Sequence, residues 1–114
     1  MRIGGYKRYH RNLGFFQVVL VIFPPGTCTP AHDHNLPVRG ICLWGTLLEY
    51  VQTERKPFFD LHLLECFTRF KESPGAVHQV ANRSPKSGAL LDFYPRGDLA
   101  MKTYPPLIED LAVS

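Results

Sequence analysis

Three histidines have the residue type and the spacing to hold one metal ion. His32 and His34 are separated by a single residue, so on a β-strand both imidazole rings project from the same face. His78 follows the turn-forming pair Pro74–Gly75 and begins a segment with two valines nearby, which predicts that it lies on a neighbouring strand. We therefore expect His32, His34 and His78 to converge on one divalent metal.

The ligand type does not by itself choose the metal. Neutral imidazole suits Fe, Zn, Cu and Ni alike. Three neutral ligands leave the ion its full 2+ charge, which favours an anionic ligand beside the histidines. His10 and His62 lie outside this spacing, and we expect both to be ordinary surface or hydrogen-bonded core residues.

Short strands between turns must position the three histidines. Turn residues recur along the chain, as at 24–26, 73–75 and 85–88, and the segments between them have the composition of strands. Only residues 106–112 resemble a helix. Many short strands without long helices are typical of an all-β sandwich or barrel. The expected strands span residues 6–12, 15–23, 28–33, 39–44, 47–53, 58–64, 67–71, 77–81, 89–94 and 100–104.

Composition indicates a single globular domain covering residues 1–114. Of the 114 residues, 45% are hydrophobic and 20% are charged, enough for one core. The longest apolar run, 15–26, is shorter than the about 20 residues of a membrane span. No secretory signal is visible and the three cysteines form no C-x2-C pair, so we expect a cytoplasmic protein with reduced thiols. The net charge of +3 is small and scattered, which argues against a nucleic-acid partner.

The residues around the histidines follow two motifs, and in these the chain resembles the cupin superfamily. The first motif, G-x5-H-x-H-x3/4-E-x6-G, is matched by Gly26, His32, His34 and Gly45. The second, G-x5-P-x-G-x2-H-x3-N, is matched in part, with one residue fewer between its Pro and its Gly, by Pro74, Gly75, His78 and Asn82. The resemblance implies a single cupin domain, an all-β jelly-roll barrel also called a double-stranded β-helix.

The position of the cupin glutamate is occupied by Val38. The carboxylate ligand of ordinary cupins is therefore absent, and the three histidines remain as ligands. If Val38 faces the metal, the alternation of a strand places Gly40 and Cys42 inside as well, and Ile41 and Leu43 outside. Two apolar residues outside suggest a covered surface. A second copy of the chain, in a homodimer, and the chain's own termini are the two candidate covers.

A three-histidine site without the glutamate is characteristic of the thiol dioxygenases among the cupins, and further segments resemble this group. Residues 30–34 resemble its S/T-P-x-H-D-H signature, and residues 78–84 resemble its H-R-V-E-N-x-S. Residues 6–8 resemble the Y-x-R of cysteine dioxygenase and the bacterial 3-mercaptopropionate dioxygenases, and residues 91–94 resemble their L-H-x-Y. The similarity covers nearly the whole chain.

The resemblance also implies roles for residues outside the histidine trio. Arg8 would hold a substrate carboxylate, because a guanidinium offers two parallel donors, with Tyr6 beside it in the substrate site. Tyr94 would be a catalytic phenol that donates to the substrate or to bound oxygen. The chain departs from the group at Leu90 and Asp92, where the family has a Ser and a His. Asp92 could orient Tyr94 or a ligand histidine, but a carboxylate cannot replace an imidazole donor.

These observations predict an oxidoreductase, a metal-dependent thiol dioxygenase that uses O2 to oxidise cysteine, a mercapto acid or a related small thiol to its sulfinate. The resemblance implies Fe(II), while Zn, Ni, Mn and Cu stay open. Two alternatives remain, because one fold hosts many functions. One is another metal-dependent cupin enzyme, such as a carbon-substrate dioxygenase or an isomerase. The other is a non-catalytic cupin that binds a metal or small ligand, which would have neither Arg8 nor Tyr94 in its cavity.

Overall fold

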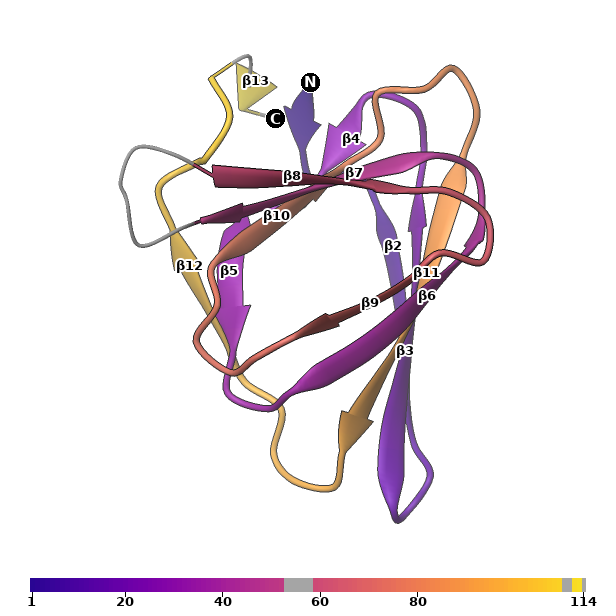
Figure 1. Cartoon of the computed structure of the whole chain (residues 1–114), viewed down its shortest axis with the longest axis vertical. Coiled ribbons are helices and arrows are strands. Elements are labelled where there is room, and N and C mark those ends of the chain that lie inside the picture. Colours follow the sequence, from indigo (N-terminus) through magenta and orange to yellow (C-terminus); the bar gives the residue numbers. More distant parts are fainter. Residues whose placement is uncertain (53–58, 110–111, 114) are drawn as a thin grey trace.

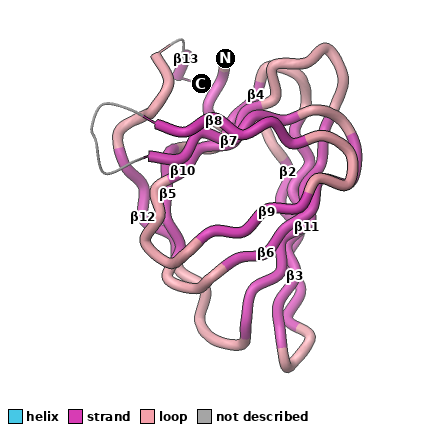
Figure 2. Tube along the Cα trace, viewed as in Figure 1, coloured by secondary structure: helices cyan, strands magenta, loops and turns pink. Residues whose placement is uncertain are grey.

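The computed structural model describes residues 1–52, 59–109 and 112–113. Within these residues the chain forms strands, turns and loops and no helix, as Figure 2 shows. The strands build two sheets that face each other across the main core (Figure 1). This part of the chain accordingly offers no helix that could cross a membrane.

The five-stranded sheet alternates buried and exposed residues. In its second strand the residues Gln17, Val19, Val21 and Phe23 are buried, and those between them are more exposed. This period of two puts one face of the sheet against the core. In spatial order the strands are β2 (Lys7–Asn12), β3 (Phe16–Phe23), β11 (Gly88–Pro95), β6 (Val38–Trp44) and β9 (Arg69–Glu72).

The eight-stranded sheet carries the histidines. Its main path runs through β12 (Met101–Tyr104), β5 (Ala31–His34), β10 (His78–Ala81), β4 (Thr27–Cys28), β1 (Arg2–Ile3) and β13 (Ala112–Val113). In addition β7 (Leu47–Gln52) pairs with β10 and with β8 (Phe59–Leu64). Strand β10 therefore contacts β4, β5 and β7, which places it at the centre of this sheet.

The alternation expected along β6 is confirmed. Val38, Gly40 and Cys42 are buried, whereas Ile41 and Leu43 on the other face are only partly buried. Strand β6 thus contributes small or apolar residues to the interior, and two apolar residues beside the exposed Arg39 to its outer face. The two candidate covers of this face, a second copy of the chain and the chain's own termini, both stay predictions.

The expected strands are confirmed, with shifted ends. Each of the ten overlaps an observed strand, and residues 53 and 58 of two of them lie outside the described residues. The expected strand 28–33 is two strands, β4 and β5, with Thr29 and Pro30 between them, because a proline offers no N–H to a sheet ladder. Strands β1 and β13 are two residues long and were not expected.

The helix expected at 106–112 is wrong for the part that the structure describes. Residues 106–109 form no helix, and Ala112–Val113 form β13. Tertiary contacts decide the local structure here, because the Leu107 N–H donates to Gln79 Oε1 and Ile108 packs in a second apolar cluster with Tyr50. Residues 110–111 lie outside the described residues.

Gly40 leaves room for the Phe70 ring. The two residues are partners in the β6–β9 pair, and a Cβ on Gly40 would overlap the outer end of that ring. We expect Gly40→Ala to lower the free energy of unfolding by about 1–3 kcal/mol, the usual cost of overpacking. Chemical denaturation would measure this, and Phe70→Leu in the same chain should restore part of the loss. A midpoint equal to that of the wild type would contradict the packing argument.

Candidate metal centre

The three histidines meet, as their spacing predicts. His32 and His34 lie on β5, and His78 opens β10 as the direct partner of His32 in the pairing of the two strands. The ring centroids are 4.3 Å apart for His32 and His78, 4.8 Å for His32 and His34, and 5.1 Å for His34 and His78. One ring nitrogen from each lies within 4.8 Å of the others. This arrangement can hold one metal ion after small rotations of the rings.

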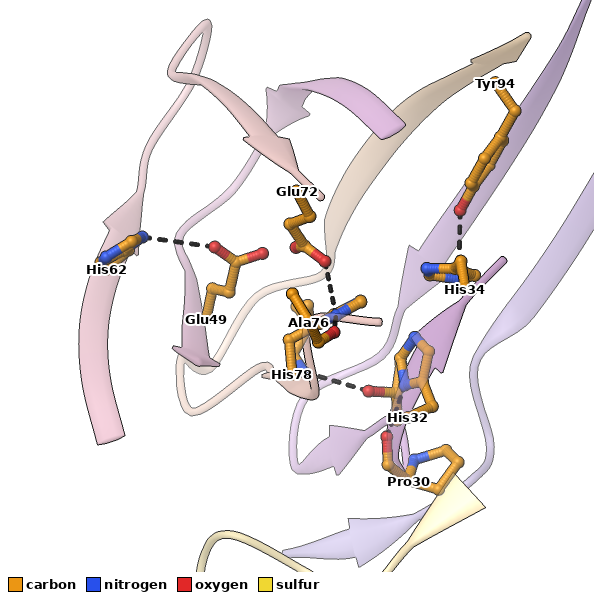
Figure 3. A network of polar contacts seen from close by, with 11 residues as sticks. Pro30, His32, His34, Glu49, His62, Glu72, Ala76, His78 and Tyr94 are labelled. Atoms are coloured by element: carbon orange, nitrogen blue, oxygen red, sulfur yellow. Dashed lines mark hydrogen bonds and ion pairs between the residues drawn. The ribbon is translucent and has the colours of Figure 1, made fainter. Parts of the chain in front are cut away.

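Backbone carbonyls fix the orientation of two of the rings. Nδ1 of His32 lies 2.7 Å from the Pro30 carbonyl oxygen, and Nδ1 of His78 lies 2.9 Å from that of Ala76 (Figure 3). A carbonyl oxygen only accepts, so each Nδ1 carries the hydrogen and each Nε2 keeps a free lone pair. This is the tautomer that a metal-binding imidazole needs.

The imidazoles are also in the neutral form that binds metals. Burial lowers the pKa of His32 to about 4, with His78 as a further cause. Burial, together with His32 and His78, lowers the pKa of His34 to about 3. Burial lowers the pKa of His78 as well. At neutral pH no proton has to leave before an ion binds.

A cavity of about 290 Å³ opens beside the histidines. Its wall is largely apolar and includes Val38, which is only 2% exposed. The residue that stands at the cupin glutamate position therefore faces the metal site but offers no ligand atom. The donor set of the candidate centre is three neutral nitrogens.

The residues with implied roles also line this cavity. Tyr94 Oη lies 3.2 Å from Nε2 of His34 (Figure 3), and burial raises the pKa of Tyr94, so its phenol remains a hydrogen-bond donor at neutral pH. Arg8 and Tyr6 line the cavity from β2 and the residues before it. The structure thus places Arg8, Tyr6 and Tyr94 around one space with the histidines.

The two positions where the chain departs from the thiol dioxygenases lie in the same wall. Leu90 adds apolar surface, and Asp92 lines the cavity with its Oδ1 enclosed and without a hydrogen-bond partner. Burial raises the pKa of Asp92 to about 7. Among the described residues no hydrogen bond joins Asp92 to Tyr94 or to a histidine, so the orienting role considered for Asp92 has no contact to support it.

Two buried glutamates behind His78 were missed in the sequence. Glu72 Oε2 lies 2.5 Å from Nδ1 of His78, and Glu49 lies 3.3 Å from Nδ1 of His62, which is 53% exposed (Figure 3). The Glu49 carboxyl group also lies beside that of Glu72. Glu49 lies on the same face of β7 as Leu47 and Val51, because the three residues are two apart. A glutamate on this inward face was the signal in the sequence that could have revealed its burial. His62, expected to be an ordinary residue, is the outer end of this chain of contacts.

The neighbouring carboxyl groups of Glu49 and Glu72 can share a proton. Burial, followed by the hydrogen bond with Glu72, raises the pKa of Glu49 to about 9. Burial raises the pKa of Glu72 to about 7. The Oε2 atom of each is buried without a hydrogen-bond partner, so a proton on Glu49 would let one carboxyl group donate to the other.

This raised pKa predicts how stability depends on pH. Below pH 4.5 Glu49 is protonated in the folded and unfolded states alike, and between pH 4.5 and about 9 only the unfolded state ionises. The folded state loses stability across that window as pH rises. We expect Glu49→Gln to raise the melting temperature of the metal-free protein at pH 8 and to change it much less at pH 4. A melting temperature at or below that of the wild type at pH 8 would contradict this.

Comparison with solved structures identifies the fold. The recombinant oxalate oxidase in complex with glycolate superposes with a TM-score of 0.77 at 14% identity, over 87% of this chain and 55% of that chain. An uncharacterised Klebsiella pneumoniae protein with a double-stranded β-helix domain gives a TM-score of 0.74 at 17% identity, over 88% of this chain and 84% of that one. The chain has the double-stranded β-helix fold of the cupins, as its motifs predict.

Manganese is named for another structural neighbour. The oxalate decarboxylase of Bacillus subtilis, described with Mn(II) centres, gives a TM-score of 0.78 at 16% identity, over 88% of this chain and 28% of that chain. This chain therefore spans about half of the oxalate oxidase and less of the decarboxylase. No protein-family model matches the sequence. None of the curated proteins matches it either. The thiol dioxygenase prediction rests on the sequence motifs alone.

Proposed function

We propose that this protein is a metal-dependent cupin enzyme that transforms a small carboxylate-bearing substrate. The proposal rests on one cavity that is lined by three neutral histidines, by the guanidinium group of Arg8 and by the phenol of Tyr94. Such convergence of polar groups in a mostly apolar pocket is typical of a small-molecule site. Structural neighbours that act on oxalate support a carboxylic acid as substrate.

His32, His34 and His78 would hold the ion. Their neutral Nε2 atoms suit Fe(II), and Mn(II) is the ion named for a neighbour with the same fold. The remaining positions of the ion would be left to substrate and water. When bound, the ion would supply a Lewis-acidic 2+ centre able to take part in redox chemistry with O2. Since the protein adds no negative ligand, an anionic substrate is favoured.

The other side chains of the cavity would select and orient the substrate. Arg8 would bind the carboxylate through two parallel N–H donors. Tyr94, whose hydroxyl lies 3.2 Å from His34 Nε2, would donate a hydrogen bond to a substrate atom beside that ligand. The apolar wall, which includes Val38 and Leu90, would limit substrate size and exclude water.

Thiol dioxygenation is the second candidate. It is favoured by the presence of Arg8 and Tyr94 together in the cavity, the feature expected to separate this activity from a non-catalytic cupin. In this case a substrate thiolate and O2 would combine, with both oxygen atoms inserted at sulfur to give the sulfinate.

A substrate panel tests both candidates. The protein would be loaded anaerobically with Fe(II) or Mn(II), and O2 uptake and CO2 release would be followed with oxalate, glycolate, cysteine, 3-mercaptopropionate and cysteamine. Turnover of a carboxylic acid without a thiol supports the first candidate, and O2 uptake with thiols alone supports the second. Tight metal binding without turnover of any of these compounds would favour a non-catalytic metal-binding cupin and contradict both.

A further inference from the structure

We propose that Glu72 is a positioning residue, which orients His78 for binding the metal. From the neighbouring strand it supplies, close to the site, the carboxylate that position 38 lacks. The proposal rests on the metal site of the proposed function. It adds a residue, a contact and a charge to that site, and its test does not depend on which substrate the protein uses.

The register of the strands brings Glu72 to the vacated position. Val38 on β6 and Glu72 on β9 are direct partners in an antiparallel pair, and both line the cavity. Side chains directly opposite each other in such a pair lie about 4.5–5.5 Å apart at Cβ. The carboxylate that the cupin motif carries at position 38 is therefore present in this chain one strand away.

Glu72 reaches the third ligand rather than the metal position. Its Oε2 lies 2.5 Å from Nδ1 of His78, the nitrogen on the far side of the ring from the free Nε2. The single hydrogen on Nδ1 points toward the Ala76 carbonyl at 2.9 Å, and the carboxyl oxygen approaches the same nitrogen off that line. With two acceptors beside Nδ1, a flipped ring would lose both contacts, so Nε2 stays directed at His32 and His34.

Glu72 is itself held in place from behind. Its carboxyl group lies beside that of Glu49, and Glu49 contacts His62 on β8 at 3.3 Å. The Glu72 and Glu49 side chains are only 5% and 1% exposed. The chain from His62 to His78 thus crosses four strands, β8, β7, β9 and β10 (Figure 3).

Fold stability alone does not account for this arrangement. Burying two carboxyl groups side by side costs free energy unless each is fully paired, and apolar residues of similar volume would fill the same space. A carboxyl group beside the outer nitrogen of a metal-binding imidazole opposes rotation of the ring and, when ionised, attracts the positive charge that the ring gains when it binds an ion. We infer that the buried pair is present for the metal that His78 binds.

Measurements of metal affinity and of thermal stability distinguish a positioning role of Glu72 from a purely structural role. Mn(II) binding to the whole chain would be measured by titration calorimetry for the wild type, Glu72→Gln and Glu72→Leu, with the exposed Glu65→Gln as the matched control. We expect Glu72→Leu to weaken Mn(II) binding by about 10–100-fold, and Glu72→Gln, which keeps an acceptor oxygen, to weaken it less. The metal-free variants should melt at or above the wild-type temperature, which a purely structural role would not allow.

A carboxylate exchange between the two strands gives the second test. Val38→Glu with Glu72→Val should bind Mn(II) within about tenfold of the wild type, because the carboxylate then reaches the ion directly from position 38. Wild-type Mn(II) affinity in both Glu72 variants would overturn the positioning role while leaving the metal site in place. A wild type that binds neither Mn(II) nor Fe(II) would instead refute the proposed function. If Glu72→Leu does not fold, the isosteric Glu72→Gln still decides, through its Mn(II) affinity.

Discussion

Alanine at His32, His34 or His78 is expected to remove most of the bound metal. Each histidine supplies one of three nitrogens that lie within 4.8 Å of one another, and no protein carboxylate stands at position 38 to compensate. Loss of a partner that only orients a metal ligand costs about 10–100-fold in affinity, so loss of the ligand itself should cost more than 100-fold. Elemental analysis after gel filtration, on protein loaded with Fe(II) or Mn(II), measures the effect.

A histidine outside the trio provides the control. His10 contacts Gln17 through Nε2 at 2.8 Å and is not one of the three grouped histidines. The His10→Ala protein should therefore keep its metal. Full metal content in His78→Ala would show that the third ligand is wrong, even if His32 and His34 were required.

Replacement of Arg8 by alanine is expected to impair substrates that carry a carboxylate far more than those that lack one. A charge-assisted, bidentate contact contributes about 2–4 kcal/mol, which corresponds to roughly 30- to 1000-fold in kcat/KM. Oxalate, cysteine and 3-mercaptopropionate should all lose this factor if they are substrates. Cysteamine, a thiol without a carboxylate, should lose little.

Arg11 is the matched control for this experiment. Both arginines are exposed on β2, but Arg8 lines the cavity, whereas Arg11 donates to the His10 carbonyl. Arg11→Ala should leave the preference for carboxylates unchanged. Equal losses on cysteamine and on the acids in Arg8→Ala would contradict a carboxylate-binding role and would point to an effect on the fold of β2.

Local pattern was sufficient to predict the fold and the grouping of the three histidines. The alternation of apolar residues along β3 and β6 places their buried faces, because successive side chains of a strand point to opposite sides. The His-x-His spacing puts two rings on one face for the same reason. His78 could be added because a Pro-Gly turn fixes where β10 begins.

Contacts between distant strands could not be predicted in this way. The position of Glu72 opposite Val38 depends on the register of β6 and β9, and the contact of Glu49 with His62 depends on that of β7 and β8. Neither register can be derived from the residues of one strand. The helix expected at 106–112 failed for a similar reason, since packing of Ile108 against the core outweighs weak helical periodicity.

Anomalous diffraction from crystals loaded with Mn(II) would locate the ion and its ligands in one experiment. The account predicts a single strong peak bound by the Nε2 atoms of His32, His34 and His78, with only water or added substrate completing the coordination and with Glu72 beside His78 Nδ1. A peak elsewhere in the molecule, or one bound directly by the Glu72 carboxylate, would contradict a metal centre built from three neutral histidines.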